Sequence, residues 1–186
     1  MRNTTLIVTF IFFTLILVAC GSENPDLTGN WQSYQYDDLG ISYELPEAWV
    51  TQEVNGVITL ASDQEILNNN LSTGAGATIM LATASDFEGW SEPLDILGLF
   101  MDYLEMGRED LEQIREPEFI AIQGQPAGTV SYRGTVQEQT GLFIGVVITN
   151  EDHIGLMLAF DGSDGERHQE TLERITQSIS VYPPSE

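Results

Sequence analysis

Two long apolar segments joined by a short polar link limit the folds open to this chain more than any other feature. Residues 142–148 and 154–160 are nearly continuous runs of apolar side chains, with Asn150-Glu151-Asp152-His153 between them. So short a connection predicts an antiparallel hairpin. Strands that are apolar on both faces have to be covered on both faces. The chain therefore needs a sheet with a layer packed on each side.

Other segments have the alternation or the flanking turns of β-strands. They are residues 31–36, 41–45, 50–54, 57–61, 77–83, 118–123 and 129–136. Asn55-Gly56 is the strongest hairpin signal, because a type I′ turn needs positive φ at both central residues. Gly124-Gln125-Pro126-Ala127 is a turn by composition. In residues 129–136 apolar and polar side chains alternate, which predicts one wetter face that carries Thr129 and Ser131.

Helical spacing occurs twice. Residues 94–104 place leucine and methionine on one face, with Ser91 as N-cap and Gly107 as C-terminal stop, while Gly98 would allow close backbone packing. The last helix carries apolar residues at 172, 175 and 179 and opens with Ser163 and Glu166 in the capping-box relation.

Shorter helical segments are also expected. Residues 108–115 predict a short acidic helix before Pro117, and residues 62–76 predict a loop with one helical turn. Strands linked mainly by hairpins, with helices among them, define an α+β fold. We predict an antiparallel β-sheet flanked by helices on both faces, an α/β/α sandwich.

The N-terminal segment has the order of an export signal. Arg2 supplies a positive charge, residues 6–19 form an apolar stretch interrupted only by Thr9 and Thr14, and small Ala19 ends it. The polar residues that begin at Gly21 come too soon for a membrane-spanning helix, which needs about 18 to 20 apolar residues. Cleavage is therefore favoured over spanning.

Leu17-Val18-Ala19-Cys20 resembles the lipobox of bacterial lipoproteins. The resemblance implies cleavage before Cys20, lipid attachment to its sulfur and a site on the extracytoplasmic side of the membrane in the bacterial cell envelope. The alternatives are an ordinary secretory peptide and an uncleaved anchor. Cys20 is the only cysteine, so no internal disulfide can form.

The expected organisation has four parts. They are a signal peptide at residues 1–19, a lipidated tether at 20–30, one folded domain at 31–182 and a tail at 183–186. The tether is rich in Gly, Ser, Asn, Pro and Asp, and the domain has an ordinary length for a single core.

The charge is strongly acidic. The sequence has 29 Asp and Glu against 6 Lys and Arg, a net charge of −23, and the 6 cations are all arginine. Nucleic acids and anionic lipid headgroups need clustered cations, so this surface disfavours both as partners. The acidity serves either solubility, the favoured interpretation, or attraction of cations or a basic protein.

Short motifs resemble PsbP-like proteins. Gly40-Ile41-Ser42-Tyr43-Glu44-Leu45-Pro46-Glu47-Ala48-Trp49 is similar to their opening motif. Gly124-Gln125-Pro126-Ala127 resembles their central turn, and Leu172-Glu173-Arg174-Ile175-Thr176-Gln177-Ser178-Ile179 resembles their closing helix. The likeness covers roughly residues 34–181 and implies the PsbP-like α/β/α fold.

The resemblance also implies a binding role. PsbP is an extrinsic photosystem II subunit that supports calcium and chloride retention, and a fold relative is a Ran-binding nuclear import factor. Neither is an enzyme. Docking of the photosynthetic protein uses basic residues, whereas this chain has no lysine and only 6 arginines, so no ligand residue is transferred. Many bacterial relatives are lipoproteins, and this chain is similar to them.

The sequence contains no recognisable group of catalytic or metal-binding residues. Only His153 and His168 offer a conventional base, and we interpret His153 as a surface turn residue and His168 as the edge of a packed helix face. Residues 161–166 differ from an EF-hand in the glycine position, so a turn followed by a helix cap is favoured over calcium binding. No catalytic, metal-binding or cofactor-binding residue is assigned.

Aromatic residues gather near the first hairpin: Trp31, Tyr34, Tyr36, Tyr43 and Trp49. They form either core or a recognition surface for a protein or a carbohydrate, and core is favoured. The sequence thus predicts a lipid-anchored, non-enzymatic binding or accessory module for an unknown protein or membrane complex. The alternatives are a small-ligand or calcium-binding lipoprotein and a hydrolase with an unrecognised site.

Overall fold

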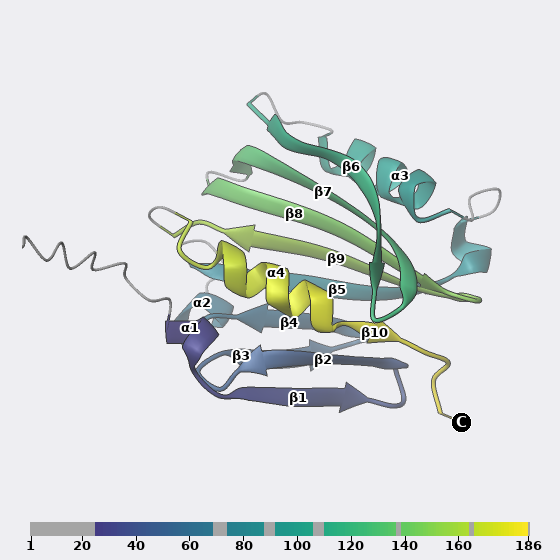
Figure 1. The fold of residues 1–186 in the computed structure, drawn as a ribbon, viewed down its shortest axis with the longest axis horizontal. Coiled ribbons are helices and arrows are strands. Elements are labelled where there is room, and N and C mark those ends of the chain that lie inside the picture. The colour runs from purple at the N-terminus through teal and green to yellow at the C-terminus, as the bar shows by residue number, and fades with distance from the viewer. Residues whose placement is uncertain are drawn as a thin grey trace, which may run out of the picture.

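The computed structural model describes residues 25–68, 74–87, 92–105, 110–136, 139–163 and 166–185. The strands of these residues form two antiparallel sheets (Figure 1). The large sheet has the order β3-β4-β5-β9-β8-β7-β6, and the small sheet has the order β1-β2-β10.

The large sheet consists of β3 (Val50–Val54), β4 (Val57–Ala61), β5 (Ala75–Thr83), β6 (Glu112–Ile122), β7 (Gln125–Val136), β8 (Gln139–Asn150) and β9 (His153–Asp161). The small sheet consists of β1 (Trp31–Tyr36), β2 (Ile41–Pro46) and β10 (Ser180–Val181). The helices are α1 (Pro25–Thr28), α2 (Gln64–Asn68), the 3₁₀ helix η1 (Ala84–Phe87), α3 (Pro93–Glu105) and α4 (Gln169–Ser178).

The two apolar segments form the β8–β9 hairpin inside the large sheet, as expected. Asn150 pairs with His153 at its end, and Glu151 adopts the positive φ of 52° that the turn requires. On one face of the sheet, Phe143 and Val147 belong to the core under α3. On the other face, Ile144 and Val146 belong to the core that α4 and the small sheet cover. The predicted α+β fold with helices on both faces is confirmed.

The small sheet is an addition that the sequence analysis did not anticipate. The first hairpin pairs with β10 rather than with the large sheet, so β2 lies between β1 and β10. Figure 1 shows this sheet below the large one, with α4 in front. Gln125 of β7 links the two sheets, because its Nε2 donates to the Val181 carbonyl at 2.6 Å and its Oε1 accepts from the Val181 N–H at 3.0 Å.

The β3–β4 and β6–β7 hairpins both turn through two residues with positive φ. Asn55 and Gly56 have φ of 54° and 80°, which confirms the predicted hairpin between β3 and β4. The β6–β7 turn is Gln123-Gly124, with φ of 50° and 77°. The predicted turn at 124–127 therefore misses Gln123 and includes three residues that belong to β7. Pro126 lies in β7 before Ala127, the first residue that pairs with β8. Its missing N–H therefore removes no hydrogen bond between β7 and β8.

The predicted acidic helix at 108–115 is wrong where the structure describes it. Residues 112–115 belong to β6, and residues 108 and 109 lie outside the described part. β6 is the outermost strand and is exposed from residue 112 to 119, so it lacks the alternation that identifies a half-buried strand. Pairing with β7 fixes its conformation, which local sequence does not reveal.

Three finer expectations are also corrected. α4 begins at Gln169 rather than at a capping box of Ser163 and Glu166. Thr129 and Ser131 are buried on the α4 side of β7, because α4 covers the face that the alternation assigned to water. A Cβ added to Gly98 would meet nothing within 4 Å, so this glycine does not serve close packing. The predicted cap Ser91 and stop Gly107 lie outside the described residues.

Candidate functional site

The predicted lipid-attachment segment, Leu17, Val18, Ala19 and Cys20, lies outside the described residues. It therefore stays a prediction. Residues 25–28 of the expected tether form helix α1. Among the described residues, no helix is long and apolar enough to cross a membrane.

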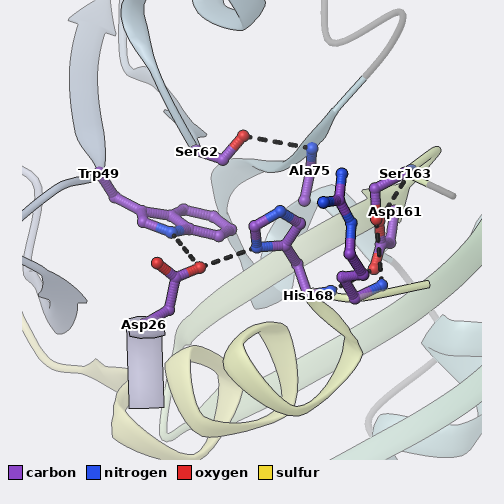
Figure 2. A network of polar contacts seen from close by, with 8 residues as sticks. Asp26, Trp49, Ser62, Ala75, Asp161, Ser163 and His168 are labelled. Atoms are coloured by element: carbon purple, nitrogen blue, oxygen red, sulfur yellow. Dashed lines mark hydrogen bonds and ion pairs between the residues drawn. The ribbon is translucent and has the colours of Figure 1, made fainter. Parts of the chain in front are cut away.

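His168 holds α1 against α4. It is the N-cap residue of α4, and its Nδ1 lies 2.8 Å from Oδ2 of Asp26 in α1. The indole Nε1 of Trp49 donates to the same oxygen at 3.1 Å, and the two rings pack edge to face (Figure 2). The Asp26 side chain is only 11% exposed. His168 is thus half-buried with Nδ1 hydrogen-bonded, and it lies at the N-terminus of α4 rather than along the packed face of this helix; its contacts tie the N-terminal end of the described chain to the domain.

Asp161, at the end of β9, organises the segment that leads into α4. Its carboxylate is fully buried and accepts from the Ser163 N–H at 3.0 Å, the Ser163 hydroxyl at 2.5 Å and the His168 N–H at 2.8 Å. These bonds satisfy a buried charge with protein donors. The preference for a turn over a calcium loop fits this arrangement, although Ser163 and Glu166 do not form the helix cap.

His153 is the other candidate base. It is the first residue of β9, half-buried, and its Nδ1 is buried without a hydrogen-bond partner among the described residues. It therefore lies at a strand end rather than on an open turn. Across the described ranges, no three His, Cys, Asp or Glu side chains gather closely enough to hold a metal ion.

A polar hollow separates α4 from the small sheet. We call it the α4 groove; its volume is about 370 Å³, and its polar lining includes Ser33, Ser42, Glu44, Arg174, Gln177 and Ser180. Apart from Arg174, none of these side chains is hydrogen-bonded to another described residue. Free hydroxyl, amide and carboxylate groups on one surface can bind a polar partner. The residues that line this groove have polar side chains, whereas pockets for small molecules are lined mainly by apolar ones.

A second hollow of about 360 Å³ lies on the other side of α4, next to β6 and β7. Arg115 and Glu173 face each other across it at 3.5 Å, and Arg174 lines both hollows. The guanidinium of Arg174 lies 3.9 Å from the centre of the Trp31 ring and contacts the Leu27 carbonyl at 3.5 Å. One of the few cations of this acidic chain is therefore fixed between α1, β1 and α4.

The aromatic residues of the first hairpin are partly core and partly surface. Tyr43 and Trp49 are buried, while Trp31, Tyr34 and Tyr36 are half-buried. Tyr34 and Tyr36 stack on Tyr43, with ring centres 5.6 and 6.2 Å apart. Tyr43 and Trp49 are thus core residues, and Trp31, Tyr34 and Tyr36 pack against this core while part of their surface stays in solvent.

Burial raises the pKa of Tyr43 well above its ordinary value of 10.0, although its hydrogen bond with Thr51, at 2.7 Å, acts in the opposite direction. The hydrogen bonds from Arg133 lower the pKa of Glu166. Within the part of the chain that the structure describes, Tyr43 has no basic partner that would activate it, so its raised pKa marks a packed core position.

The sequence analysis named no residue of the α4 groove as a site. The groove forms between segments far apart in the sequence, such as Ser33 and Arg174, so no local motif contains it. The available signal was Arg174 and Gln177 at i, i+3 on a helix whose apolar residues occupy the opposite face.

The comparisons with known proteins bear on the fold. No protein-family model matches the sequence, and no curated protein matches it either. The solution structure of cyanobacterial PsbP (CyanoP) from Synechocystis sp. PCC 6803 is similar, with a TM-score of 0.57 and 17% identity over 83% of this chain and 94% of that one.

A crystal structure of a protein from Bacteroides thetaiotaomicron is also similar, with a TM-score of 0.54 and 6% identity. It covers 83% of this chain, and this chain spans 50% of that protein. Likeness at such low identity establishes the fold alone. The PsbP-like fold expected from the short motifs is therefore confirmed.

Proposed function

We propose that this protein is a lipid-anchored, extracytoplasmic binding module that recognises another protein or a membrane complex without catalysing a reaction. The leader and the lipobox-like Leu17-Val18-Ala19-Cys20 support the location. The PsbP-like fold supports an accessory role, because the resemblance carries binding functions rather than enzymatic ones.

The docking of α1 supports a position close to the membrane. Asp26 is held by His168 and Trp49, so α1, which starts at Pro25, is packed against the domain. The stretch from Cys20 to Pro25 spans at most about 18 Å when fully extended. A partner of the domain therefore lies near the bilayer surface, as a membrane complex does.

The observation that carries the proposed function is the surface formed by the α4 groove and β1. Its hydroxyl, amide and carboxylate groups are unpartnered within the described chain, and half-buried Trp31 lies on the same face of β1 as Ser33, beneath Arg174, while Tyr34 and Tyr36 lie on the other face and stack on Tyr43. Tyrosine, tryptophan and arginine contribute most to binding at protein interfaces. A polar groove beside such side chains suits a protein partner better than an enclosed small molecule.

Two measurements test the proposal. Labelling of the full chain in bacteria with an alkyne-bearing palmitate should modify the wild type and not Cys20→Ser. A photo-cross-linking amino acid placed at Gln32 or Gln35, both exposed on β1, should join the protein to one defined membrane partner.

The matched control places the same cross-linker at Leu99, which is exposed on α3 on the opposite face of the large sheet. A partner captured equally from Leu99 and from Gln35 would contradict recognition by the small sheet. An unlabelled cysteine would contradict the anchor.

A further inference from the structure

β1 is the least protected of the sheet edges that the structure describes. It pairs with β2 over six consecutive residues without a bulge, and among the described strands it has no other neighbour. It contains no charged residue and no proline. In Figure 1 it forms the lower margin of the molecule, with no described element beyond it.

The other edges carry features that prevent further pairing. β6 contains Pro117, two register irregularities and charged residues, including Arg115 and Glu116. β3 is a five-residue strand that carries Glu53. Prolines, bulges, charges and short length are the usual means by which edge strands avoid other chains. β1 lacks the first three of these protections.

The direction of the free backbone groups on β1 follows from a bond on β2. The N–H of Glu44, which lies opposite Ser33, donates to Oγ of Ser178, on the side away from β1. In an antiparallel pair, opposed residues either exchange both backbone bonds or exchange none. Ser33 and Glu44 therefore exchange none, and the N–H and C=O of Ser33 point outward.

The same alternation repeats every two residues along the strand. Trp31 and Gln35 therefore present their backbone groups outward as well, and Pro46, opposite Trp31, has no N–H to offer. The edge exposes three donors and three acceptors in the spacing of a β-strand. An extended peptide satisfies such a row, and it does so independently of its own side chains.

The net charge of the chain favours a different protein over a second copy of this chain as the partner of β1. Exposed Asp37 and Asp38 end the hairpin, Glu44 lies on the neighbouring strand, and the whole chain has a net charge of −23. Two copies paired through β1 would bring two strongly acidic chains together, which opposes association. A basic segment gains from the same field, and long cationic side chains on it can reach Glu44 in the α4 groove.

We propose that β1 binds an extended, basic segment of the partner protein as a fourth strand of the small sheet. This inference rests on the proposed function, because it describes how the binding module holds its partner. Trp31 on one face of β1, and Tyr34 and Tyr36 on the other, then contact side chains on the two faces of the added strand. The outward N–H and C=O groups supply the affinity that does not depend on sequence.

The test uses the full chain, purified with its anchor in detergent, and a phage-displayed library of random ten-residue peptides. Selected peptides should carry net positive charge, and their binding should protect the amides of residues 31, 33 and 35 from hydrogen exchange. Ser33→Pro removes one outward donor and no bond within the sheet. It should weaken binding about tenfold, as expected for one hydrogen bond at a packed edge.

Ser33→Ala is the matched control, because it removes the hydroxyl in the groove and keeps the backbone N–H. It should bind the selected peptides as the wild type does. If Ser33→Pro does not fold, peptides methylated on alternate backbone nitrogens replace it: one set of alternate positions should abolish binding and the other should not.

Several results would overturn the inference. They are a selection without enriched peptides, peptides that bind Ser33→Pro normally, an equal loss in both Ser33 variants, and sedimentation that reveals a dimer abolished by Ser33→Pro. The proposed function is tested separately by cross-linking from membranes. A partner that is captured there and still binds Ser33→Pro normally would support the proposed function. It would contradict binding of that partner as an added strand.

Discussion

Replacing Gln125 should loosen the small sheet and its binding edge without disrupting the large sheet. Its side-chain amide is the described link that bonds both backbone groups of Val181 in β10, at 2.6 and 3.0 Å. The amide thus occupies the place of a neighbouring strand. Gln125→Ala removes both bonds at once.

The size of the effect follows from the two bonds. A hydrogen bond of this kind contributes a net free energy of about 0.5 to 1.5 kcal/mol, so the pair contributes about 1 to 3 kcal/mol. The Val181 carbonyl keeps the bond from Asn150, at 2.6 Å, which places the expected loss near the middle of that range. A loss of about 2 kcal/mol lowers Tm by roughly 4 to 8 °C in a domain of this length.

Denaturant unfolding followed by circular dichroism measures the change. Gln113→Ala is the matched control, because Gln113 is exposed on β6 and makes one long bond of 3.4 Å to the Arg115 carbonyl. Its unfolding free energy should change by less than about 0.5 kcal/mol. If Gln125→Ala matched this control, the argument that a side chain joins the two sheets would be refuted.

Gln125→Glu sharpens the test through pH. An ionised carboxylate accepts from the Val181 N–H but cannot donate to the Val181 carbonyl, so folding favours its protonated form and raises its pKa above the unfolded value. The stability of this variant relative to Gln125→Ala should be greatest below about pH 4 and should decrease as pH rises. A difference that grew with pH would contradict the bond to the carbonyl.

Further predictions concern three parts of the fold. Gly98→Ala, in open space on α3, should stabilise by about 0.5 to 1 kcal/mol in thermal unfolding. Gly141→Ala should destabilise by about 1 to 3 kcal/mol, because its Cβ would lie 2.3 Å from the Asp161 carbonyl oxygen. The raised pKa of Tyr43 predicts that stability falls above pH 10, where only the unfolded chain loses this proton, by about 1.4 kcal/mol per pH unit, and Tyr43→Phe should reduce the slope. Asp26→Ala should lower stability by about 1 to 3 kcal/mol and speed proteolysis near α1; unchanged cleavage would argue against the docking of this helix.

The layers of the fold could be predicted from the sequence because they depend on local patterns. The apolar runs of β8 and β9 require cover on both faces, and Asn55-Gly56 fixes its turn by its own φ preferences. The error at residues 112–115 has the opposite cause. An exposed edge strand has no burial pattern, and only its pairing with β7 makes it a strand.

The candidate site could be predicted only in part. The aromatic group around the first hairpin was visible in the sequence, but its division into buried Tyr43 and half-exposed Trp31 depends on which face of the small sheet packs inward. The α4 groove was invisible, because Glu44 and Arg174 meet only when both sheets are assembled. Side chains that the fold brings to one groove from such distant positions have no signature in adjacent residues.

β10 is the last described strand along the chain, so the small sheet can be completed only after the other described strands have been synthesised. Ser180 and Val181 pair with Ser42 and Ile41, which precede them by most of the chain. On a ribosome, the first hairpin emerges well before its second neighbour and waits without it until residues 180 and 181 have been synthesised. Contacts of such sequence separation slow folding. The small sheet of a nascent chain therefore stays incomplete until β10 is free to pair with β2.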